Sequence, residues 1–191
     1  MLVSLAVPAG ALALILAHSH HSGSSGASIA GTTPTTDSPP VDKSKAKVGT
    51  PAPDFTLRTT AGKSVTLSGL RGHPVVIAFF ASWCHPCEEE LPVLQDFQRE
   101  DAGRLQVIGV NFQDLPSDTA AFVRRLGVTF PALLEDPSGP IAQRYGVLEI
   151  PQTIFIDKDG VVLGRVYGQT SKHDLQPAID DLLNGVDIRP V

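Results

Sequence analysis

An unbroken apolar segment, Pro74–Phe80 (PVVIAFF), places the strongest constraint on how this chain can fold. A run of this kind is typical of a β-strand that is covered on both faces. Apolar residues then recur at every third position from Leu91 to Phe97, which predicts a helix over Glu88–Glu100. The chain therefore passes directly from a buried strand into an amphipathic helix, and its only cysteines, Cys84 and Cys87, lie at that junction.

After Val48 the sequence alternates strand patterns with helix patterns, and glycine-containing turns indicate two hairpins. This alternation predicts an α/β fold with a central mixed β-sheet flanked by helices and an N-terminal β-hairpin. The other predicted strands lie within Phe55–Leu67 (the first hairpin), Leu105–Phe112, Pro131–Leu134, Thr153–Asp157 and Val161–Tyr167, and the other predicted helices cover Asp118–Leu126, Ile141–Tyr145 and Leu175–Asn184.

The N-terminal part of the chain has a different composition from the rest. Leu2–Ala17 is uncharged and has the length of a signal-peptide apolar region, shorter than the roughly 20 residues that span a bilayer. In Ser22–Asp42, 15 of 21 residues are Gly, Ser, Thr or Pro, too few apolar side chains to form a core. We therefore expect a signal peptide or membrane anchor over residues 1–21, a flexible linker over 22–47 and a folded domain over 48–191.

The overall composition excludes several classes of protein. With 15 Lys and Arg against 20 Asp and Glu, the chain has a net charge of -5 and cannot build the basic surface that nucleic acids require. Two cysteines cannot form a multi-disulfide scaffold or a four-cysteine zinc site. We expect a monomer that binds no nucleic acid and has no metal site.

The position of the two cysteines gives them different chemistry. Cys84 is expected at the N-terminus of the helix, where free backbone N–H groups and the helix dipole stabilise a thiolate. Cys87, one turn further on, would resolve a mixed disulfide formed by Cys84. A purely structural disulfide across so short a loop would gain little from loop closure, and covalent haem attachment would require histidine where Glu88 stands.

Four segments resemble the thioredoxin superfamily. They are the motif WCHPC at residues 83–87 with the Glu-Leu-Pro that follows it, the downstream segment Ile150–Asp157 (IPQTIFID), the N-terminal segment Val48–Leu57 (VGTPAPDFTL) and the strand–helix stretch Leu105–Leu126. The last two are similar to the TlpA/ResA/DsbE-like branch of membrane-tethered or secreted thiol-disulfide oxidoreductases. The resemblance covers residues 48–184 and implies a thioredoxin-like fold in which residues 105–126 form a central strand–helix insertion.

The resemblance also implies roles for particular residues beside the cysteines. It implies a cis peptide bond between Ile150 and Pro151, which would present backbone hydrogen-bonding groups to a substrate strand. It further implies that Glu90, three residues after Cys87 and on the same helix face, is an active-site carboxylate. Ordinary thioredoxins carry a buried aspartate on the preceding strand, at the position of Ala78 here.

The residues around the cysteine pair are expected to set its reduction potential. His85 and Pro86 stand between the cysteines, and Trp83 precedes them. Proline before the second cysteine matches reducing thioredoxins, whereas a histidine can stabilise the thiolate and make the disulfide more oxidising. These opposing effects leave the direction of electron flow open.

The leading hypothesis is an extracytoplasmic thiol-disulfide oxidoreductase whose only redox group is the Cys84–Cys87 disulfide. Its partners would be exported proteins with cysteine thiols or disulfides, and a membrane or extracytoplasmic protein that recycles the pair. It would either reduce disulfides, for example in apocytochrome c, or install them as an oxidase.

Two other classes of protein share parts of the pattern. A peroxiredoxin needs Thr or Ser three residues before its reactive cysteine and Pro seven residues before it, and neither Cys84 nor Cys87 meets this requirement. A copper chaperone of the same fold would space its cysteines by three residues and use a distant histidine. The only late candidate for that ligand is His173.

Overall fold

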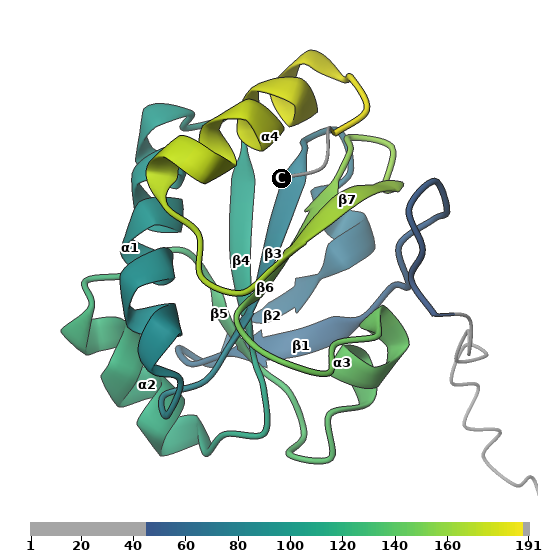
Figure 1. Ribbon diagram of the computed structural model, residues 1–191. Coiled ribbons are helices and arrows are strands. Elements are labelled where there is room, and N and C mark those ends of the chain that lie inside the picture. Colours follow the sequence, from purple (N-terminus) through teal and green to yellow (C-terminus); the bar gives the residue numbers. More distant parts are fainter. Residues whose placement is uncertain (1–44, 189–191) are drawn as a thin grey trace, which may run out of the picture. The chain divides into compact units, whose positions relative to one another are not determined.

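The computed structural model describes residues 45–188, which form a seven-stranded sheet with helices packed against it (Figure 1). The predictions for residues 1–21 and for nearly all of the linker lie outside the described residues. The elements are β1 Thr56–Thr59, β2 Ser64–Thr66, the 3₁₀ helix η1 Leu67–Leu70, β3 Val75–Phe80, α1 His85–Glu100, β4 Gln106–Asn111, α2 Pro116–Arg125, β5 Ala132–Leu134, α3 Pro140–Tyr145, β6 Gln152–Ile156, β7 Val162–Tyr167 and α4 Lys172–Asn184.

The sheet is mixed, as the sequence predicted, with the strand order β2-β1-β5-β4-β3-β6-β7. Strand β3 pairs in parallel with β4 and antiparallel with β6, and β4 pairs in parallel with β5. The hairpins β1–β2 and β6–β7 lie at the two edges of the sheet. All six residues of β3 are buried, which confirms the prediction from its unbroken apolar run.

Two hydrophobic clusters lie on opposite faces of the sheet. Val76, Ala78 and Phe80 of β3 belong to the cluster that also contains the buried apolar residues of α1, α2 and α4. The alternate residues of β3 point to the other face and pack with Tyr145 of α3 and Phe55. Alternation along one strand therefore assigns three helices to one face and α3 to the other.

The ends of the helices differ from the predicted ends for identifiable reasons. Helix α1 starts at His85 rather than Glu88, because proline is well tolerated in the first helical turn and Pro86 lies there. Pro92 lies inside α1 and does not end it. Helix α4 is preceded by a capping box at Ser171 and ends at Asn184, and it is followed by Gly185, whose φ of 66° suits glycine.

The folded contacts begin just before the predicted domain start. Ala46 is buried, its N–H donates to the carbonyl of Arg144 at 2.8 Å, and its carbonyl accepts from Arg165 at 2.8 Å. Within residues 45–188, the structure contains no helix that is both long and apolar enough to cross a membrane.

Candidate active site

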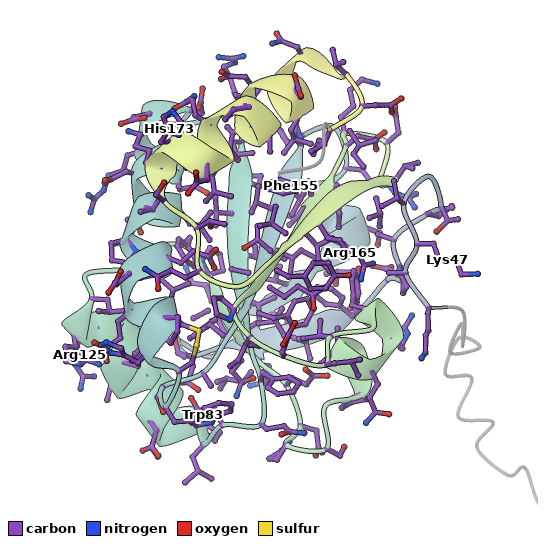
Figure 2. The ribbon with its side chains drawn as sticks, viewed as in Figure 1. Lys47, Trp83, Arg125, Phe155, Arg165 and His173 are labelled. Carbon is purple, nitrogen blue, oxygen red and sulfur yellow. A yellow bond between two sulfur atoms is a disulfide. The ribbon has the colours of Figure 1, made fainter. Side chains whose placement is uncertain are left out.

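The two cysteines form a disulfide at the start of α1, with 5.3 Å between their Cα atoms. Cys84 is the N-cap residue of α1, and Cys87 lies in its first turn. Figure 2 shows the sulfur atoms between the start of α1 and the sheet, not far from Trp83. Cys84 retains 5% of its surface exposed, whereas Cys87 is fully buried. A reacting partner can therefore approach Cys84 but not Cys87.

The peptide bond between Ile150 and Pro151 is cis, as the resemblance implied. Gln152, directly after Pro151, pairs with Phe79 near the end of β3, and the chain runs from β3 to Cys84, so the cis bond lies at the same end of the sheet as the disulfide. Pro151 is buried, and its carbonyl accepts a hydrogen bond from Gly168 at 2.9 Å. The start of β6 also meets α1, because the Thr153 hydroxyl donates to Glu90 at 3.4 Å.

Glu90 lies inside the protein, one turn after Cys87, and is 1% exposed. Its Oε1 accepts from the hydroxyl of Thr170 at 2.5 Å, and its Oε2 accepts from Thr153 at 3.4 Å. Burial raises the pKa of Glu90 to about 7, although the hydrogen bonds from Thr170 and Thr153 act to lower it. Near neutral pH this carboxyl can therefore both accept and release a proton.

Ala78, at the position where the resemblance implies the buried aspartate of ordinary thioredoxins, is a buried alanine on β3. In the β3–β6 pair, Ala78 stands opposite Thr153, the residue that donates to Glu90. Because alanine has no carboxylate, the buried carboxyl group of the site is that of Glu90 on α1 and does not come from the sheet.

His85 lies on the surface and is linked to a cation that the sequence analysis missed. Its Nδ1 is 4.0 Å from Oε2 of Glu88, and Oε1 of Glu88 is 2.7 Å from Nη2 of Arg125 in α2. The hydrogen bond from Arg125 is the main cause that lowers the pKa of Glu88. No local pattern in the sequence connects Arg125 with the cysteine motif, because 37 residues separate it from Glu88.

Trp83 lies at the surface just before Cys84, with 59% of its area exposed. Its indole Nε1 donates to the carbonyl of Gln113 at 3.4 Å. Leu148, three residues before Pro151, is 90% exposed. Apolar side chains are therefore exposed on both loops that carry the site.

Among the described residues, His173 forms no interaction with either cysteine. Its Nδ1 lies 3.7 Å from Asp174 at the start of α4, and the side chain is almost fully exposed. Across residues 45–188, no three His, Cys, Asp or Glu side chains are grouped so that they could hold a metal ion.

Gln152, directly after Pro151, is the one described residue whose buried side-chain nitrogen or oxygen atoms lack hydrogen-bond partners. An unpaired buried amide costs about 1–3 kcal/mol. We therefore expect Gln152→Met to raise the free energy of unfolding by about 1–2 kcal/mol, measured by urea denaturation. Gln95→Met is the matched control and should lower it, because Gln95 Oε1 accepts three hydrogen bonds. A loss of stability in Gln152→Met would show that its amide is satisfied.

A cysteine pair at the start of a helix, entered from a buried central strand and beside a cis-proline, defines a thiol-disulfide protein of the thioredoxin fold. The chain belongs to the AhpC/TSA family, whose sequence model matches residues 48–165.

Individual relatives agree with this assignment. Over 135 residues the chain is 34% identical to the thioredoxin-like protein YneN of Bacillus subtilis, covering 69% of this chain and 78% of YneN. It is 31% identical over 136 residues to the thiol-disulfide oxidoreductase ResA of Bacillus thuringiensis, covering 71% and 78% of the two chains. A DsbE-type thiol:disulfide interchange protein from Chlorobium tepidum superposes with a TM-score of 0.67 at 32% identity, covering 73% of this chain and 99% of that one.

Proposed function

We propose that this protein is a thiol-disulfide oxidoreductase that reduces disulfide bonds in exported proteins, with apocytochrome c as the candidate substrate. The observation that carries the proposal is the Cys84–Cys87 disulfide at the N-terminus of α1, beside the cis bond before Pro151. The names of the relatives ResA and DsbE support the reaction class.

The geometry supports a two-step exchange. In the reduced protein, the Cys84 thiolate attacks one sulfur of a substrate disulfide, and the other substrate sulfur leaves as a thiolate. Cys87 then gives its proton to the Glu90 carboxylate and attacks the Cys84 sulfur. This step releases the second substrate sulfur and forms the Cys84–Cys87 disulfide. Two electrons pass from the protein to the substrate.

The surroundings of the site favour an extended polypeptide as the substrate. The substrate strand would pair with backbone of the cis-proline loop, and Trp83 and Leu148 offer exposed apolar side chains on the two loops of the site. Ile150 and Pro151 would hold the substrate strand, while Trp83, His85 and Pro86 would set the potential of the pair.

The proposed location is outside the cytoplasm, either anchored to the membrane or secreted. The uncharged segment Leu2–Ala17 and the Gly/Ser/Thr/Pro-rich segment that follows it support export and a flexible linker before the domain. A membrane or extracytoplasmic donor would return electrons to the pair, and the protein would act as a monomer. Fractionation of cells that make the full chain tests the location.

The direction of electron flow is tested with a peptide that carries one internal disulfide of the Cys-x-x-Cys-His type. The reduced protein should convert it to the dithiol and become oxidised at Cys84 and Cys87. If the oxidised protein instead closes the reduced peptide far faster than the reverse reaction, the protein is an oxidase. If neither reaction occurs, the proposed function is wrong.

A further inference from the structure

Asp114 is a buried carboxylate between β4 and α2 that takes no part in the exchange described above. It is 5% exposed, and each of its two carboxylate oxygens accepts two hydrogen bonds. Oδ1 accepts from the Ser82 hydroxyl at 2.9 Å and from the Leu115 N–H at 2.9 Å. Oδ2 accepts from the Ser82 N–H at 2.7 Å and from the Thr119 hydroxyl at 3.0 Å. The carboxylate therefore fixes both the backbone and the side chain of Ser82.

This pattern requires a carboxylate and not an amide. One backbone N–H points at each oxygen of Asp114, from Ser82 on one side and from Leu115 on the other. An asparagine would place an NH₂ group against one of these donors, whichever way the amide turned. An ionised aspartate has acceptors only, so both N–H groups are satisfied.

We call the four hydrogen bonds to the Asp114 carboxylate the Asp114 clamp. Ser82 lies two residues before Cys84, so this clamp acts on the segment that carries the attacking sulfur. The neighbouring Gln113 holds the next residue, because its carbonyl accepts from the Trp83 indole at 3.4 Å. Gln113 has a φ of 48°, a left-handed conformation that is uncommon for residues other than glycine. Such a conformation persists when the surrounding contacts determine it.

The same buried groups continue away from Cys84. The Asn111 side-chain Nδ2 donates to the Asp114 carbonyl at 3.1 Å, and its Oδ1 accepts from the Glu135 N–H at 2.5 Å. The Glu135 carboxylate in turn accepts from the N–H groups of Ile141 and Ala142, in the first turn of α3. Asn111 and Glu135 are both buried.

Helix α3 leads directly into the loop of the cis-proline. It ends at Tyr145, and five residues connect it to Pro151. A continuous set of buried polar contacts thus joins the loop that carries Cys84 to the element that carries the Pro151 loop.

We propose that Asp114 is a positioning residue that fixes the Cys84 loop relative to the cis-proline loop, so that a protein substrate can engage both at once. This inference rests on the proposed function, since it concerns how the same site binds its substrate. A small disulfide needs only the Cys84 sulfur, whereas a polypeptide must pair with the Pro151 loop while its disulfide meets Cys84.

The test compares the Asp114→Asn variant with the wild-type protein on two substrates. The value of kcat/KM for insulin reduction should fall about tenfold, because small displacements of a reacting group are costly. The rate constant for reaction with 5,5′-dithiobis(2-nitrobenzoate) should stay within about twofold, since this reagent does not use the second loop. If Asp114→Asn does not fold, Ser82→Ala removes one hydrogen bond of the clamp and should show a smaller loss on insulin alone.

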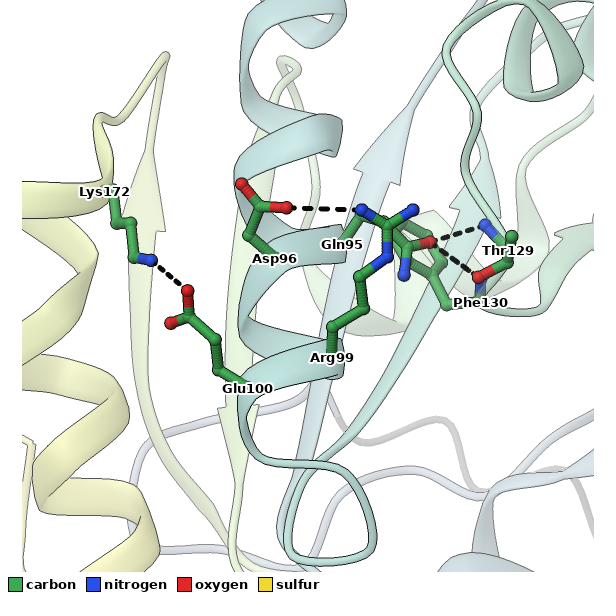
Figure 3. Close-up of polar contacts among 7 residues, drawn as sticks. All are labelled: Gln95, Asp96, Arg99, Glu100, Thr129, Phe130 and Lys172. Carbon is green, nitrogen blue, oxygen red and sulfur yellow. Dashed lines mark hydrogen bonds and ion pairs between the residues drawn. The ribbon is translucent and has the colours of Figure 1, made fainter.

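Gln95→Met is the control for a general loss of stability. Gln95 on α1 is another buried side chain that accepts several hydrogen bonds, and it is remote from the Cys84 loop. Figure 3 shows its Oε1 accepting from the backbone N–H and the hydroxyl of Thr129. This variant should react with both substrates at the wild-type rate. Equal losses on insulin and the small disulfide in Asp114→Asn, or no loss on either, would overturn the inference. A wild-type protein that reacts with neither substrate would instead refute the proposed function.

Discussion

Replacement of Cys84 by serine is expected to lower the rate of insulin reduction at least about a thousandfold, because a serine hydroxyl is almost un-ionised and weakly nucleophilic at neutral pH. Cys84 is the cysteine at the N-cap of α1 and the one with exposed surface, so Cys87 cannot replace it in the first attack. The rate is measured with dithiothreitol as the electron source. A Cys84→Ser variant that retains wild-type turnover would contradict the assignment.

Cys87→Ser provides the matched control for this prediction. It should also lose catalytic turnover, but its Cys84 can still attack once. When the reduced variant is mixed with insulin in the absence of dithiothreitol, we therefore expect one equivalent of substrate thiol to be released per protein molecule, followed by no further reaction. The two variants differ by a single sulfur in the same turn of α1, so a general effect on folding cannot explain a difference between them.

Replacement of Glu90 by glutamine is expected to stabilise the protein at alkaline pH. The folded-state pKa of Glu90 is about 7, above the ordinary value of 4.5, because burial disfavours the charged form. The stabilising contribution of this group is therefore fully present below about pH 4.5 and is lost as the pH rises through about 7. Glutamine does not ionise and can still accept from Thr170.

The expected gain for Glu90→Gln is up to about 3 kcal/mol in the free energy of unfolding at pH 8, with no difference near pH 4. Urea denaturation at several pH values measures it. If the stability difference does not change with pH, the Glu90 carboxyl has an ordinary pKa in the folded protein.

The same substitution should slow the exchange reaction. If Glu90 accepts the proton of Cys87, kcat for insulin reduction should fall about a hundredfold at pH 7, within the range typical of general-base catalysis. Glu89→Gln is the control, since Glu89 is the adjacent exposed acid whose carboxylate accepts from Gln169. Equal activities in the Glu89→Gln and Glu90→Gln variants would exclude the proton-transfer role.

The elements of the fold could be predicted because their signals are local. The apolar run of β3, the helical spacing in α1 and the glycine turns of both hairpins are all short-range patterns, and each element formed within a few residues of its predicted place. The pairing of β1 with β5 was not predicted. This pairing depends on which strands, far apart in the sequence, lie side by side in the sheet, and the hydrophobic periodicity of each strand contains no information about its partner.

The candidate site divides in the same way. Cys84 and Cys87 follow from their position at the junction, and the cis bond before Pro151 follows from the resemblance. The partners of these residues are remote in the sequence: Thr170 lies 80 residues from Glu90, and Asp114 lies 32 residues from Ser82. Short polar side chains such as these have no distinguishing pattern, and only the folded chain shows that they meet buried groups.

The most direct test of the central claim is to identify the sulfur that attacks the substrate. The Cys87→Ser variant is mixed with insulin, quenched with acid, digested and analysed by mass spectrometry without reduction. The account predicts a mixed disulfide between insulin and the peptide that contains Cys84. Complete absence of this adduct, with Cys84 recovered as a free thiol, would contradict it.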